Sequence, residues 1–288
     1  MTQMNPYDGK RILETAALGT RLVRTKLAGA TDAQLSFVGL KTKDRDALLE
    51  RPVTLFLHNH PADPEEGGVA AMHYHRISNK KDGTFISYSL PLLSAAGIPT
   101  DPIIGLSAHE NFHAAKHAGG TSYHDKKDIK PIVEGAVGIT LTGLGFLLHK
   151  PWLAVPSLAL VAQSCVRYAS SSARYLKQEE LGAFKFETIF SLSAFDSNRF
   201  DLSLEKDEPE PSLRTGYPTE REQAAVINAT RNALLHVDKS LLFFQNAADY
   251  RNALRNEFQA NQNDPMIRLE YDSDSLVRRV CGQRPRSE

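Results

Sequence analysis

The chain is poor in cysteine, carries no net charge and lacks an apolar leader at its N-terminus. Its 288 residues include only Cys165 and Cys281, which form neither a zinc-knuckle spacing nor a disulfide framework. Such sparse cysteine is consistent with a reducing compartment. The formal net charge is +0, so no broad basic field exists to attract phosphates, and we expect no nucleic-acid partner. The polar start of the chain predicts no secretory signal peptide.

The remaining composition is that of an ordinary folded protein, with 41% hydrophobic and 24% charged residues. Helical periodicity dominates, and short β-prone runs occur at 53–57, 72–77 and 84–90. We therefore expect an α+β fold that is mostly helical with a small sheet. We divide the chain into an N-terminal helical segment (1–50), a core (51–225) and a C-terminal helical segment with a basic tail (226–288).

The pentapeptide from His109 to His113 is the most informative motif, because it reads H-E-x-x-H. On a helix, positions i and i+4 share one face, so both imidazoles can reach one metal ion. Glu110 then lies beside the water that such a metal binds, where a general base is needed. The motif predicts a zinc site of the peptidase type.

Local signals place this motif inside a helix that covers 101–118. Asp101 is a good N-cap and Pro102 suits the first helical position. The pair Gly119-Gly120 is a stop signal at the other end.

An uncharged apolar block follows the motif, within 132–166. It consists of two arms, 135–148 and 152–166, each of about 15 residues and so shorter than the roughly 20 that span a bilayer. Two interpretations remain: a membrane hairpin that extends through its polar flanks, or a buried helical pair. Trp152 and Tyr168 near the ends of the second arm suit a membrane interface.

Catalytic zinc requires a third protein ligand and an open water position. A third histidine in the extended form of the motif would stand at position 119, which is Gly119, so that form is excluded. Carboxylates remain as candidates. Glu134 follows the motif at a spacing close to that of thermolysin-like peptidases, and Glu179 and Glu180 lie on a helix predicted over 174–195.

The order of these features resembles the zinc metallopeptidases of the HtpX and CAAX prenyl protease type. A strand, the H-E-x-x-H helix, an apolar hairpin and an E-x-x-A motif at Glu180-Leu181-Gly182-Ala183 follow one another. The resemblance implies a zincin-like core in 51–225, with the hairpin 132–166 between the motif helix and the third-ligand helix. It implies one Zn²⁺ per chain, held by His109, His113 and Glu180, with Glu179 and Glu134 as rival third ligands.

The sequence departs from this family at three positions around the metal. Phe184 stands where the family has the aspartate after E-x-x-A, and Ala118 replaces an aspartate that follows the second motif histidine. Tyr217-Pro218 stands in place of His-Pro, which makes Tyr217 the candidate for oxyanion support. These departures predict altered surroundings for the metal ligands.

The sequence thus predicts a zinc-dependent metalloendopeptidase that acts on protein or peptide substrates, with Glu110 as the general base for a zinc-activated water. In this interpretation the strand at 84–90, as the edge strand, pairs with the substrate. The hairpin makes the protein membrane-associated through lipid contact, with the catalytic site on the cytoplasmic side. The alternatives are a weakly active or inactive zinc-binding relative that serves as a membrane-associated or scaffold protein, and a soluble cytoplasmic hydrolase of a non-protein amide.

Overall fold

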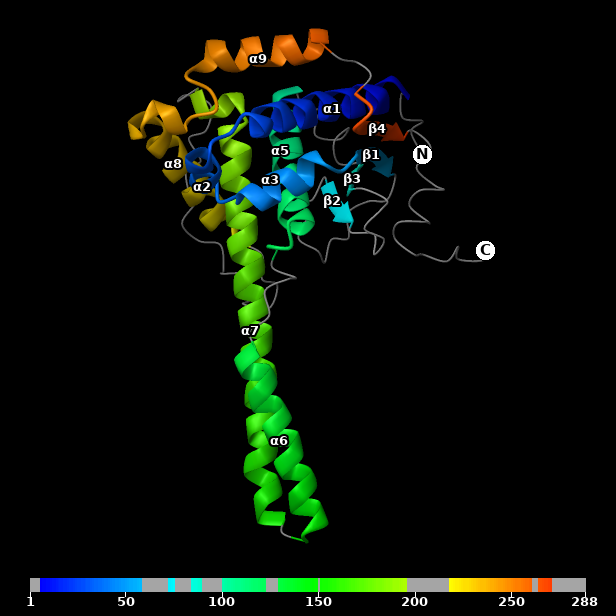
Figure 1. Ribbon diagram of the computed structural model, residues 1–288, viewed down its shortest axis with the longest axis vertical. Coiled ribbons are helices and arrows are strands. Elements are labelled where there is room, and N and C mark those ends of the chain that lie inside the picture. Colours follow the sequence, from blue (N-terminus) through cyan, green and yellow to red (C-terminus); the bar gives the residue numbers. More distant parts are fainter. Residues whose placement is uncertain are drawn as a thin grey trace.

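A computed structural model describes residues 6–58, 72–75, 84–89, 100–122, 129–149, 151–195, 218–260 and 264–270. These residues are mostly helical with one small sheet, which confirms the predicted fold class at this level. Figure 1 shows a body that contains the sheet and most helices, and a long helical hairpin that projects from it. Tyr217 and the basic tail lie outside the described residues.

The sheet has four strands in the order β2-β3-β1-β4, namely β2 (Met72–His75), β3 (Thr84–Ser89), β1 (Val53–His58) and β4 (Ile267–Glu270). β1 is parallel to both β3 and β4, whereas β2 is antiparallel to β3. β3 is therefore an interior strand, and the prediction that it forms the edge is wrong. Among the described strands that edge belongs to β2, which also lies close to the motif helix.

Three helices precede the sheet: α1 (Pro6–Ala28), α2 (Asp32–Phe37) and α3 (Thr42–Leu49). α1 crosses the motif helix at very close range, because a Cβ on Gly19 would lie 2.9 Å from the Cβ of Ser107. Thr31 begins α2 with a capping box, in which its hydroxyl accepts a hydrogen bond from the Gln34 backbone N–H. The N-terminal segment is thus part of the wall behind the motif helix (Figure 1).

The motif helix, α5, extends over Thr100–Ala118, close to the predicted 101–118. The prediction that Asp101 is its N-cap is wrong, because Asp101 already lies within the helix. It ends at the predicted glycine pair: Gly120 has φ of 65°, in the left-handed region that glycine adopts without strain. Gly119 meets α3 instead, since a Cβ there would lie 2.8 Å from the Cα of Asp44. A larger residue at 119 would separate the two helices.

The hairpin consists of α6 (Ile129–Leu147) and the first half of α7 (Pro151–Ile189). α7 is one continuous helix of 39 residues, although the sequence suggested two separate segments. Its first half pairs with α6 and its second half packs against α5 and α8 (Figure 1). Among the described helices, none is both long and apolar enough to cross a membrane.

The C-terminal part closes the body with α8 (Glu220–His236), α9 (Ala247–Ala260) and the short helices η3 (Leu192–Phe195) and η4 (Lys239–Leu241). An aromatic cluster joins these elements to the end of α7, and the hydroxyl of Tyr250 donates to the carbonyl of Phe190 at 3.0 Å. Because α9 packs on α1 and β4 pairs with β1, the described C-terminal elements share one hydrophobic core with the motif helix.

Candidate metal centre

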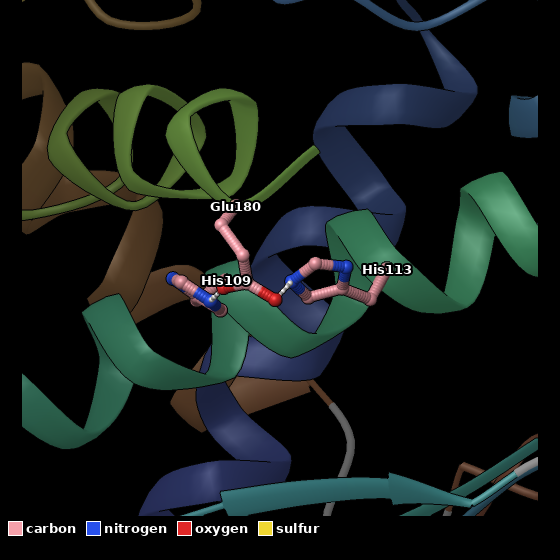
Figure 2. Close-up of side chains that lie close together, drawn as sticks. All are labelled: His109, His113 and Glu180. Carbon is pink, nitrogen blue, oxygen red and sulfur yellow. Dashed lines mark ion pairs between the residues drawn. The ribbon is translucent and has the colours of Figure 1, made fainter. Parts of the chain in front are cut away.

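Two helices bring His109, His113 and Glu180 together at one point. α5 supplies the two histidines one turn apart, and α7 directs Glu180 between their rings (Figure 2). The two carboxylate oxygens of Glu180 each lie 3.4 Å from an imidazole, at Nε2 of His109 and at Nε2 of His113. One potential ligand atom from each residue lies within 4.8 Å of the other two. This group could hold a metal ion.

Small residues on α7 let the two helices approach closely enough for this arrangement. Gly182 faces Phe112, and a Cβ at this position would lie 2.9 Å from Cζ of that ring. Ala183 is fully buried. The E-x-x-A segment therefore has a packing role beside its ligand, since its small residues set the distance between Glu180 and α5.

Each histidine also contacts a second carboxylate, at the ring nitrogen Nδ1. Oε2 of Glu187 lies 3.0 Å from Nδ1 of His109, and Oε1 of Glu179 lies 3.0 Å from Nδ1 of His113. When Nδ1–H donates to these carboxylates, the Nε2 atom of each ring is directed toward Glu180, where it carries a proton in the absence of metal and can coordinate a metal once that proton is lost. Both rings are therefore oriented for metal binding before any metal arrives.

Glu187 is a functional residue that sequence reasoning missed. Phe184, four residues after Glu180, contacts the His109 ring edge-on at 4.8 Å between centroids. The carboxylate comes from Glu187 instead, which lies two turns after Glu180 on the same face of α7. Gly105 makes room for it, because a Cβ there would lie 3.3 Å from Cγ of Glu187. The i, i+7 spacing of Glu180 and Glu187 could have indicated that both carboxylates face α5.

The charges of the site are strongly coupled. Burial alone lowers the pKa of His113, but the hydrogen bonds of Glu179 and Glu180 outweigh it and raise that pKa to about 9. For His109, Glu180 and Glu187 likewise outweigh burial and raise the pKa well above its ordinary value. Burial raises the pKa of Glu180, yet its two histidine partners together lower it well below its usual range. The carboxylates thus stabilise the protonated imidazoles, and a metal cation at this position would displace those protons.

The face of α5 that points away from Glu180 is anchored by polar side chains. Asn111 donates to Oγ1 of Thr20 at 3.1 Å and to the carbonyl of Ser107 at 2.7 Å. The Ser107 hydroxyl donates to the Ile103 carbonyl, so the hydroxyl of Tyr88 on β3 donates to Ser107 at 3.1 Å. These bonds fix the motif helix against α1 and the sheet.

Glu110 follows the first ligand histidine and is buried, with 7% of its surface exposed. Burial raises the pKa of Tyr88, and the nearby charge of Glu110 adds to this effect. Glu110 also contributes to the raised pKa of His109. Its carboxylate is therefore within electrostatic reach of both the metal-ligand group and the sheet.

The two other candidate ligands, Glu134 and Glu179, do not belong to the three-residue group. Glu134 pairs with Arg167 across the hairpin at 2.8 Å and is not part of the three-residue group. Glu179 contacts Nδ1 of His113, on the side of the ring away from Glu180, and lies 3.9 Å from Nε2 of His117.

Comparison of the chain with models of known protein families, with curated proteins and with solved structures finds no match. The site must therefore be interpreted from its own chemistry. Two imidazole nitrogens and one carboxylate oxygen form the donor set of many catalytic zinc sites, which leave a fourth position open. The buried donors, the oriented rings and the second carboxylates fit such an ion.

Proposed function

We propose that the protein is a zinc-dependent metalloendopeptidase. The observation that carries this proposal is the convergence of Glu180 on the two histidines of an H-E-x-x-H helix, with Glu110 adjacent to them. Hydrolysis of a peptide bond by a zinc-bound water needs three protein donors for the metal, one base and a place for an extended substrate.

Zinc is the metal that best suits this donor set, because mixed nitrogen and oxygen ligands in a four-coordinate site favour it over harder cations. When bound, zinc supplies a Lewis acid and lowers the pKa of a water molecule to about 7. The chain's contribution is to direct both Nε2 atoms at the ion through Glu179 and Glu187.

Glu110 acts as the general base in this proposal. Its carboxylate accepts the proton of the attacking water and then donates it to the leaving amine. Its burial at 7% exposure keeps bulk water from competing for that proton. An extended substrate pairs with the side of β2 that carries no neighbour among the described strands, and β2 lies next to α5.

The hairpin contacts a membrane in the same proposal. Among the described residues, the exposed large hydrophobic side chains lie in α6, in the turn after it and in the first half of α7, except Leu235 and Phe258. Leu147 is 79% exposed, Val155 is 72% exposed and Trp152 is 67% exposed. Contiguous apolar surface of this kind marks a membrane or protein contact.

The test is cleavage of casein by the purified chain, with and without a chelator, beside measurement of bound zinc. We expect one zinc per chain and proteolysis that the chelator abolishes. Glu110→Gln keeps the zinc and lowers the rate by about 10²- to 10⁴-fold, because only the base is lost. Glu50→Gln, an exposed carboxylate change on the body, is the matched control.

Three results would decide against parts of this assignment. Full proteolysis by a zinc-loaded Glu110→Gln protein would refute the base, and zinc binding without any cleavage by the wild type would favour the non-catalytic relative. Retention of zinc by Glu180→Ala, with its loss in Glu134→Ala, would overturn the ligand set.

A further inference from the structure

An open hollow of about 320 Å³ lies at the root of the hairpin, and none of its lining residues belongs to the group of His109, His113 and Glu180. It forms where α6 begins and where α7 leaves its pairing with α6. Its charged and hydroxyl lining consists of Lys130, Glu134, Arg167, Ser170, Ser171 and Arg174.

The charges of this hollow favour an anion. Three cationic side chains and one carboxylate line it, and that carboxylate, Glu134, pairs with Arg167 at 2.8 Å. Lys130 lies in the first turn of α6, and that turn contains no acidic residue. The positive end of the helix dipole therefore adds to the attraction of Lys130 and Arg174.

The position of the hollow along the hairpin indicates where the anion comes from. Between Glu134 and Arg167 the sequence carries a single formal charge, Lys150 at the turn. From Glu134 to Leu147 the helix rises about 20 Å, which is more than one leaflet of a hydrocarbon core of roughly 30 Å. If this apolar stretch lies in lipid, the hollow lies at the level of the headgroups.

We propose that the hollow binds the phosphate of an anionic phospholipid, whose acyl chains lie along the exposed apolar faces of α6 and α7. Lys130, Arg167 and Arg174 donate to the phosphate oxygens in charge-assisted hydrogen bonds. This inference rests on the proposed membrane contact and not on the peptidase activity.

The experiment is sedimentation of the full chain with vesicles of phosphatidylcholine, alone or mixed with phosphatidylglycerol. We expect the wild type to bind the mixed vesicles more tightly. The double variant Lys130→Gln/Arg174→Gln loses about 5-fold in affinity per cation, so about 25-fold in all, for the mixed vesicles only. Arg251→Gln/Arg255→Gln removes two exposed charges from α9, at the opposite end of the molecule (Figure 1), and changes binding little because of screening.

A neutral substitution separates a built site from diffuse attraction. Ser170→Gln leaves the charge unchanged and fills the hollow, so it lowers the preference for anionic vesicles, whereas Ser170→Ala retains it. Equal losses in the two double variants, or an unaffected Ser170→Gln protein, would overturn the proposal. Displacement from the vesicles by millimolar inorganic phosphate at constant ionic strength would also overturn it, in favour of a free-phosphate site.

The remaining outcomes keep the two proposals distinguishable. Equal binding to both vesicle types refutes the headgroup site and leaves the membrane contact in place. Absence of binding to either vesicle refutes the membrane contact as well, while casein cleavage reports separately on the metal centre.

Discussion

Removal of the Glu187 carboxylate should weaken zinc binding although Glu187 is not itself a proposed ligand. Its Oε2 lies 3.0 Å from Nδ1 of His109, and its side chain is 26% exposed. Without it, the His109 ring loses both the acceptor that fixes its tautomer and a charge that increases its basicity. Loss of such a contact typically costs 10- to 100-fold in metal affinity.

The expected loss of zinc affinity differs between substitutions. Glu187→Gln keeps an oxygen acceptor and loses only the charge, so we expect about 10-fold weaker binding. Glu187→Ala loses both, and we expect about 100-fold. Glu179 is only 2% exposed and contacts both His113 and His117, so Glu179→Ala should cost at least as much as Glu187→Ala.

Competition with a chromophoric chelator measures these affinities, and the absorption spectrum of the cobalt-substituted protein reports the ligand geometry independently of activity. Glu14→Gln, an exposed change on α1, is the matched control. Wild-type zinc affinity and an unchanged cobalt spectrum in Glu187→Ala would refute the positioning role, and Gly105→Ala, which crowds Cγ of Glu187, should show a milder form of the same defect.

Four further predictions concern the packing and the charges. Zinc affinity should rise with pH by up to tenfold per unit and per displaced proton until about pH 9, because the pKa of His113 is raised to about 9 in the metal-free protein; a chelator titration at several pH values checks this. For the same reason the metal-free protein's unfolding free energy contains a His113 contribution that is complete below the ordinary pKa of 6.5 and is lost as pH rises through about 9, which urea titrations would detect. Gly182→Val should destabilise the fold by about 1–3 kcal/mol and impair zinc binding, since its Cβ would lie 2.9 Å from Cζ of Phe112. Tyr250→Phe should lower the unfolding free energy by about 1 kcal/mol or somewhat more, because the buried carbonyl of Phe190 loses its donor, and zinc binding should not change.

The motif helix was predictable because its signals are local. Its C-terminal end follows from a glycine pair, and the two histidines share a face through helical geometry alone, whereas its first residue is Thr100 and not the residue after Asp101. Glu180 was reached through a family resemblance, and the structure brings it to the two histidines.

The sheet was less predictable because its pairings are distant in sequence. The alternation in 84–90 indicated a strand, but nothing within it revealed that β1 and β2 would cover both of its edges. The partnership of β1 with β4 joins residues more than two hundred positions apart, which no local pattern encodes. The edge role therefore belongs to β2, a weaker strand in sequence terms.

The sequence by itself determined the chemical groups: two histidines at helical spacing, an adjacent glutamate, a run of carboxylates on a second helix and an uncharged apolar block between them. Only the tertiary structure decided which carboxylate faces which ring, because that choice depends on how closely α5 and α7 approach at Gly182 and Gly105. His109 therefore has a carboxylate partner although position 184 is Phe184, since Glu187 reaches Nδ1 of His109 from two turns beyond Glu180. The sequence specifies which ligand groups are present, whereas the packing of the helices sets the distances between them.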